Sequence, residues 1–122
     1  LLWLGLDEPG YLLEAMVDHR DQLGYRGVVI GAMGGGHVPE RIAPLVTQLA
    51  SLLPTVVSPR AGAGGPMLRQ TYGGPSSEIA LLKAGLIWGG RLQPLKARVL
   101  LETCLRGGLD RAAIAEIFAA WG

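Results

Sequence analysis

The sequence predicts a three-layer α/β domain built on a four-stranded parallel sheet, and two observations lead to this class. Short apolar runs alternate along the chain with longer segments whose apolar residues recur at helical spacing. The short runs are apolar throughout, which is typical of parallel strands that are covered by helices on both faces. We therefore expect one domain over residues 1–122, of the Rossmann-like or flavodoxin-like kind.

Four strands are expected, each of them a short apolar run next to glycine or proline. They lie at residues 1–6, 27–32, 55–58 and 86–90. Residues 60–75 contain too many glycines and prolines for a helix or a central strand, so we expect a long loop there.

Five helices are expected from the spacing of their apolar residues and from their end signals. Ser76 or Ser77 can cap the third helix and Asp110 the fifth, while proline opens the second and the fourth. The helices lie at residues 10–24, 39–53, 78–84, 94–105 and 111–121. Their expected apolar faces include Leu12, Leu13, Met16, Val17 and Leu23 in the first, Ile42, Leu45, Val46, Leu49 and Leu52 in the second, and Ile114, Ile117, Phe118 and Trp121 in the last.

Composition excludes several classes of protein. Hydrophobic residues make up 49% of the chain and charged residues 17%, which fits a folded domain rather than a disordered segment. The net charge of +1 and the absence of a basic run indicate no nucleic-acid partner, and no apolar run approaches the roughly 20 residues of a membrane span. Cys104 cannot form an internal disulfide, so we expect a buried thiol and a cytoplasmic protein. Because the chain begins inside an apparent strand without methionine, we expect a fragment of a longer protein.

The glycine-rich turn after the second strand is the first candidate for a site. Ligands of parallel α/β sheets bind beyond the carboxyl ends of the strands, which selects DEPG, MGGGHVPE and PRAGAGG. Glycines 34–36 could let the backbone approach a ligand and could direct N–H groups at an anion. The turn has neither a dinucleotide fingerprint nor a P-loop, so nucleotide binding is only an alternative.

Polar residues outside this turn form no complete catalytic set of nucleophile, base and orienting group. His19 lies among charged neighbours in a helical segment, where we expect it to be solvated. Thr71 and Tyr72 lie in the long loop beside a glycine pair and are suggestive of a site without defining one. Arg60 is expected to hold the loop together.

The chain resembles the C-terminal domain of the bacterial L-asparaginases in three segments, LGYRGVVIGAMGGGHVPE, VVSPRAGAG and LIWGGRLQPLKARVLLETCL. The last segment, with proline followed by KARVLL, is the most specific, and the resemblance covers essentially the whole chain. These enzymes are threonine-nucleophile amidohydrolases that convert L-asparagine to L-aspartate and ammonia. The resemblance implies a larger N-terminal domain that supplies the catalytic residues, none of which belongs to this segment. It also implies no cofactor and no amidase activity in this segment alone.

The resemblance further implies two substrate-binding residues. In the family this domain completes the active site of a neighbouring subunit with an asparagine of the glycine-rich turn and a later glutamate. The asparagine corresponds to His37 and the glutamate to Glu78, with Gly34, Gly35 and Gly36 forming the loop at the site. We expect a homodimer or homotetramer that binds L-asparagine or a similar amide, and the histidine leaves asparagine or glutamine open.

The residues themselves also admit plainer interpretations and other functions. The ring of His37 could cap the following helix, and Glu78 could be an ordinary first-turn helix charge. The chain could instead be a free-standing α/β module that binds a small anion or nucleotide. It could also be the asparaginase-like subunit of a tRNA-dependent amidotransferase.

Overall fold

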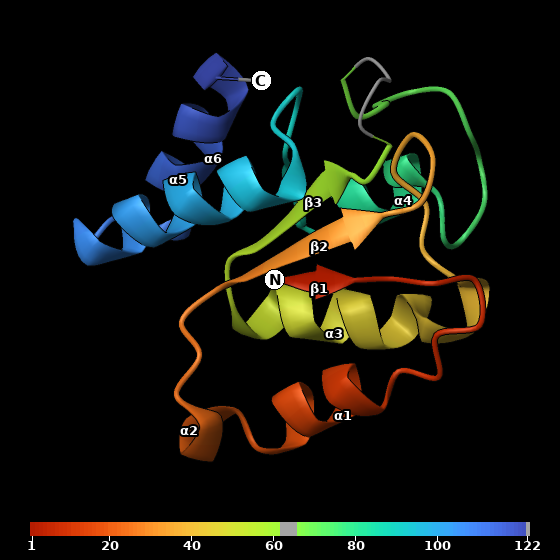
Figure 1. The fold of residues 1–122 in the computed structure, drawn as a ribbon, viewed down its shortest axis with the longest axis horizontal. Coiled ribbons are helices and arrows are strands. Elements are labelled where there is room, and N and C mark those ends of the chain that lie inside the picture. The colour runs from red at the N-terminus through yellow and green to blue at the C-terminus, as the bar shows by residue number, and fades with distance from the viewer. Residues whose placement is uncertain (62–65, 122) are drawn as a thin grey trace.

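Four parallel strands form one sheet in the computed structural model, which describes residues 1–61 and 66–121 (Figure 1). The strand order is β1-β2-β3-β4, so each strand lies beside its predecessor. The two central strands pair over their whole length, from Val28 opposite Thr55 to Ala32 opposite Pro59. The strands are β1 (Leu2–Trp3), β2 (Val28–Ala32), β3 (Thr55–Pro59) and β4 (Ile87–Trp88).

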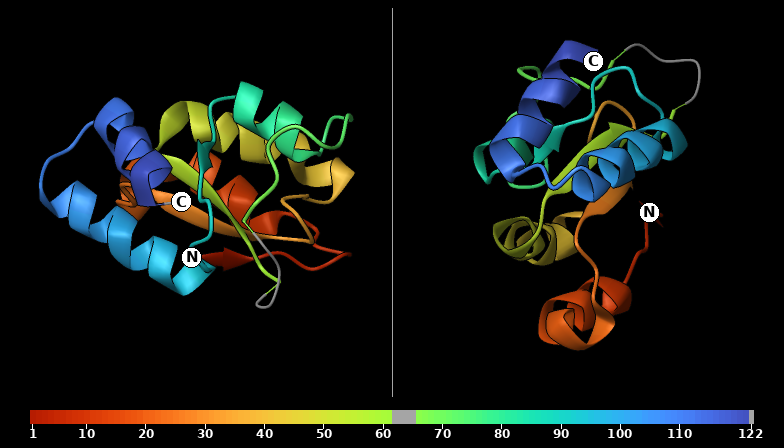
Figure 2. Two further views of the ribbon diagram at one scale, coloured as in Figure 1. Left: turned by 90° about the horizontal axis from the view of Figure 1, so that it is seen from above. Right: turned by 90° about the vertical axis from the view of Figure 1, so that its left-hand side faces the viewer.

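This strand order determines which helices cover which face. Each strand lies next to the preceding one, always toward the same edge of the sheet. Because connections between parallel strands are almost always right-handed, the helices α1, α3 and α4 that connect them all lie on one face. The other face is covered by α5 and α6, which follow the last strand (Figures 1 and 2). The predicted three-layer α/β class is therefore confirmed. The helices are α1 (Tyr11–Asp18), α2 (Arg20–Leu23), α3 (Ala43–Leu52), α4 (Glu78–Lys83), α5 (Pro94–Arg106) and α6 (Arg111–Trp121), with a 3-10 turn, η1 (Glu40–Ile42), before α3.

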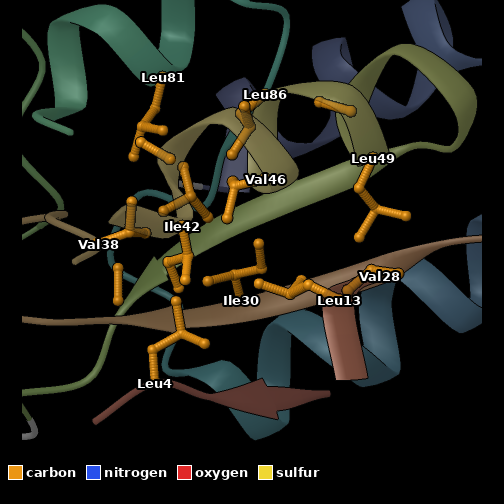
Figure 3. Packing of buried hydrophobic residues seen from close by; sticks show 14 of the residues in the cluster. Leu4, Leu13, Val28, Ile30, Val38, Ile42, Val46, Leu49, Leu81 and Leu86 are labelled. Atoms are coloured by element: carbon orange, nitrogen blue, oxygen red, sulfur yellow. The ribbon is translucent and has the colours of Figure 1, made fainter. Parts of the chain in front are cut away.

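The sheet separates two hydrophobic clusters. Ile30 packs with side chains of α1, α3 and α4, such as Leu13 and Leu81 (Figure 3). Val29, the preceding residue, belongs to the cluster under α5 and α6, because successive strand side chains point to opposite faces. Cys104 is buried in this second cluster, as predicted. Burial of each large aliphatic side chain contributes about 1.5–3 kcal/mol, so the two clusters hold the helices onto the sheet.

The two outer strands are shorter than predicted. Each comprises only two residues, whereas the sequence suggested residues 1–6 and 86–90. Pairing of the first strand extends one hydrogen bond further, from the N–H of Leu4 to the carbonyl of Gly31 at 3.2 Å. After the last strand the backbone passes so close to its neighbour that a Cβ on Gly89 would lie 2.6 Å from the carbonyl oxygen of Val57. The apolar runs are therefore longer than the paired segments.

The first predicted helix consists of two helices. His19, which is exposed, separates α1 from α2 with a backbone φ of −117°. Leu12 and Leu23 were assigned to the apolar face, but they are 55% and 45% exposed, and α2 buries no residue. Because residues 18–21 are all polar, the second half of this segment has little to hold it against the core. Gly24 ends the segment in the left-handed conformation that favours glycine.

The predicted helix caps have mixed outcomes. Asp110 caps α6, since its Oδ1 accepts a hydrogen bond from the N–H of Ala113 at 2.9 Å. Ser77 occupies the N-cap position of α4 without capping it, because its hydroxyl donates to the carbonyl of Gly74 instead, at 2.9 Å. Trp121, expected on the apolar face of the last helix, is 68% exposed.

Two kinds of feature are missing from residues 1–61 and 66–121. No helix there combines the length and the apolar character that crossing a bilayer requires. No three side chains of histidine, cysteine, aspartate or glutamate come together there as a set that could hold a metal ion.

Candidate functional site

The predicted site residues meet at the carboxyl edge of the sheet. After β2 the chain forms a tight turn, closed by two backbone hydrogen bonds of 2.8 and 2.9 Å between Met33 and His37. The segment before α4 returns to this turn, because the N–H of Leu68 donates to the carbonyl of Gly35 at 2.8 Å. The structure thereby brings His37 and Glu78 together, although they are far apart in the sequence.

The glycines of the turn make room for that returning segment. A Cβ on Gly35 would lie 2.4 Å from Cδ1 of Leu68, and one on Gly36 would lie 3.0 Å from the side chain of Met67. Gly36 also has a φ of +126°, which residues with a side chain rarely adopt. Gly35 and Gly36 thus serve the close packing of loop on turn, whereas a Cβ on Gly34 would have nothing within 4 Å.

The same turn is poorly suited to binding a phosphate. The N–H groups of Gly36 and His37 both donate to the carbonyl of Met33, at 3.0 and 2.9 Å. A phosphate cradle requires such N–H groups to point at the ligand. The geometry of the turn therefore does not favour the nucleotide-binding alternative.

Glu78 is the first residue of α4, and its side chain is fully buried. Its Oε1 accepts hydrogen bonds from the backbone N–H groups of Thr71 and Tyr72, both at 2.8 Å. Its Oε2 is buried and has no hydrogen-bond partner in the part of the chain that the structure describes. Glu78 is therefore no solvated first-turn charge, since it holds the loop onto the start of the helix.

The charge of this carboxylate follows from its surroundings. Burial raises the pKa of Glu78, but the N–H groups of Tyr72 and Thr71, its own N–H and the nearby His37 lower it. The net effect is a pKa below the usual value for glutamate, so the side chain is ionised at neutral pH. The site therefore contains a buried negative charge, one oxygen of which accepts no hydrogen bond from the described residues.

His37 lies between this oxygen and solvent. Its side chain is 32% exposed, and its Nε2 lies 4.0 Å from Oε2 of Glu78. The edge of its ring meets the ring of Tyr72, with the centroids 5.0 Å apart. The following turn, η1, has Pro39 at its N-cap position and no side-chain cap, so the ring does not serve as a helix cap.

Two further contacts anchor the loop and were not foreseen from the sequence. The indole Nε1 of Trp88 donates to the carbonyl of Met67 at 2.8 Å, and the guanidinium of Arg69 stacks on the Trp88 ring at 3.5 Å. The tryptophan in the middle of the strand predicted at residues 86–90 was the only sequence signal for this anchor.

Arg60 has a structural role, as expected, but its hydrogen bonds to the described residues link strand ends and do not hold the long loop together. Its backbone N–H donates to the carbonyl of Ala32 at 2.9 Å, and its side chain donates to the carbonyl of Leu4. The carboxyl ends of three strands are thus linked beside the turn that carries His37.

A buried carboxylate beside an imidazole can bind a cation, and a primary ammonium group suits it because it donates several hydrogen bonds. In residues 1–61 and 66–121 no hydroxyl or thiol is hydrogen-bonded to either group, whereas acyl transfer needs a nucleophile next to its base. The arrangement can therefore hold a cation, and the described residues supply no nucleophile beside it.

Comparisons with known proteins yield a family and a relative. Residues 7–118 match the model of the glutaminase/asparaginase C-terminal domain. The chain is 37% identical over 92 residues to a protein of Deinococcus radiodurans named as a probable L-asparaginase. This match covers 75% of the chain and 27% of the relative, so the chain spans about a quarter of that relative's length.

Proposed function

This chain belongs to the family of glutaminase/asparaginase C-terminal domains, and from that premise we propose that it is the C-terminal domain of an L-asparaginase-type amidohydrolase. The reaction is the hydrolysis of L-asparagine to L-aspartate and ammonia. The match over residues 7–118 carries this proposal, and the probable L-asparaginase relative supports it.

Within that function Glu78 binds the α-ammonium group of the substrate. Its Oε2 accepts no hydrogen bond from the described residues, and its Oε1 is already held by two N–H groups, so the carboxylate is fixed in place. A charge-assisted hydrogen bond of this kind contributes about 1.5–3 kcal/mol. The ionised state of Glu78 at neutral pH suits this role.

His37 lies beside Glu78 at the position of the family's asparagine. A neutral imidazole offers one donor and one acceptor, so it can replace the hydrogen bonds of an asparagine side chain with a different geometry. Because the ring is partly exposed next to Oε2 of Glu78, His37 is placed to contact the same substrate group. Because a histidine replaces the family's asparagine residue, the preference of the enzyme for L-asparagine or L-glutamine as substrate has to be measured.

The chemical step requires residues from outside this chain. We assign the nucleophilic threonine to a larger N-terminal domain, with Glu78 and His37 completing the site of a neighbouring subunit in a homodimer or homotetramer. The half-exposed position of His37 at the surface of the chain is compatible with that arrangement. The 122-residue chain alone should therefore hydrolyse no amide.

Kinetics of the enzyme that carries this domain test the proposal. Glu78→Ala should lower kcat/KM for L-asparagine by about 10- to 150-fold, which corresponds to the loss of one charge-assisted hydrogen bond. His37→Ala should lower it by less. The matched control is Glu116→Gln, because Glu116 is exposed and has no partner among the described residues. Unchanged kinetics in both site variants, with circular dichroism confirming a folded protein, would show that these residues do not bind substrate.

A further inference from the structure

The two oxygens of Glu78 have different environments, and this difference points beyond simple substrate binding. Oε1 accepts two backbone hydrogen bonds, whereas Oε2 is buried as well and accepts none from residues 1–61 and 66–121. Leaving a buried charged acceptor without a partner is costly. A positively charged hydrogen-bond donor that reaches Oε2 should therefore bind to it.

His37 can become such a donor, because its Nε2 lies near Oε2 of Glu78. At 4.0 Å, its Nε2 is too far from Oε2 for a hydrogen bond, and a small movement of the ring would form one. The titratable groups that face this imidazole are the Glu78 carboxylate on α4 and the Tyr72 phenol in the preceding loop. A protonated imidazole would thus meet a buried negative charge and an aromatic ring.

The same gap suits a primary ammonium group when the imidazole is neutral. Two acceptors that each lie about 2.8 Å from a tetrahedral ammonium nitrogen are about 4.6 Å apart. The separation of 4.0 Å between Nε2 and Oε2 is close to this span. Neutral His37 with Nε2 as an acceptor can therefore share the ammonium group with Glu78 after a shift of less than an ångström.

We propose that the protonated side chain of His37 competes with the substrate's ammonium group for Oε2 of Glu78, so that substrate binds only when His37 is neutral. His37 is then a positioning residue that makes binding depend on pH, and this role rests on the proposed amidohydrolase function. An asparagine, the family's residue here, carries no proton to gain and cannot compete in this way.

The first test follows KM and kcat separately between pH 8 and pH 5, the range in which histidine titrates. In the wild-type enzyme the apparent KM for L-asparagine should increase as the pH is lowered, because only enzyme with a neutral His37 binds substrate. Where His37 is mostly protonated, the increase should approach tenfold for each pH unit. In His37→Asn the KM should stay within about twofold over the same range, while kcat follows the same profile in both. If His37→Asn keeps the wild-type dependence of KM on pH, the competition does not exist.

The second test needs no amidase activity. The Glu78 carboxyl group is titrated by carbon-13 NMR in the wild-type chain, in His37→Asn and in His19→Asn, whose histidine is exposed and distant from the site. Because the charge of His37 lowers the pKa of Glu78, this pKa should rise in His37→Asn and stay unchanged in His19→Asn. An unchanged Glu78 titration in His37→Asn overturns the inference. The expected titration together with an enzyme that hydrolyses neither asparagine nor glutamine would instead refute the proposed function.

Discussion

Replacing Glu78 by glutamine tests how much the loop before α4 depends on one buried charge. Glutamine keeps an acceptor oxygen for the N–H groups of Thr71 and Tyr72 but removes the negative charge. Hydrogen bonds to charged groups contribute about 1.5–3 kcal/mol and neutral ones about 1 kcal/mol. The variant weakens two hydrogen bonds, but it also removes the cost of burying a charge. We therefore expect the free energy of unfolding at pH 7 to fall by about 1–2 kcal/mol.

This loss should depend on pH with a definite sign. The folded-state pKa of Glu78 lies below the usual glutamate value of 4.5, so the stability that ionised Glu78 contributes is fully present above about pH 5.5. That contribution disappears as the pH falls below 4.5 and through the lower folded-state pKa, where wild-type Glu78 becomes neutral like glutamine. The difference between wild type and Glu78→Gln should therefore shrink on acidification.

Urea unfolding followed by circular dichroism at pH 7, 5.5, 4 and 3 measures this difference. Glu116→Gln serves as the control, because this exposed glutamate has no partner in residues 1–61 and 66–121. Its replacement should change the free energy of unfolding by less than about 0.5 kcal/mol at every pH. Two results would refute the assignment of the Glu78 carboxylate as the anchor of the loop. One is a loss in free energy of unfolding for Glu78→Gln that is no larger than that of the control. The other is a loss that stays constant from pH 7 to pH 3.

Two further predictions concern the packing of the turn and the buried thiol. Gly35→Ala should lower the free energy of unfolding by about 1–3 kcal/mol, because its Cβ would lie 2.4 Å from Leu68. Gly73→Ala is the control and should change this free energy by less than about 0.5 kcal/mol, because a Cβ there has nothing within 4 Å. Equal losses of the two variants in urea unfolding would contradict the packing argument. Cys104 is buried and its thiol pKa is raised by burial, so iodoacetamide should modify it about 100-fold more slowly in the native chain than in urea, and equal rates would show that the thiol is accessible.

The central part of the fold could be predicted from the sequence because its physical signals are strong. Strands β2 and β3 are buried on both faces, so their apolar runs match the paired segments closely. The extent of β1 and β4 was not predictable, since each has a single neighbour, and the apolar run says nothing about where pairing ends. The break at His19 likewise depends on what the core can bury, which spacing alone does not reveal.

The candidate site was predictable in its residues but not in its contacts. His37 and Glu78 were selected through a family resemblance, and the structure places them 4.0 Å apart. The anchoring of Glu78 could not be foreseen, because its donors are backbone N–H groups, which every residue except proline possesses. The stacking of Arg69 on Trp88 was equally hidden, since it depends on where the loop crosses the sheet.

The short outer strands also bear on aggregation. The central strands Val28–Ala32 and Thr55–Pro59 are rich in β-branched residues, and such segments assemble readily into intermolecular sheets once exposed. Each lies between neighbours, and the two strands at the open edges offer only two residues each for pairing with another molecule. Growth of a fibril from this sheet would therefore first require the outer strands to detach, so resistance to aggregation should follow the stability of the edges rather than that of the centre.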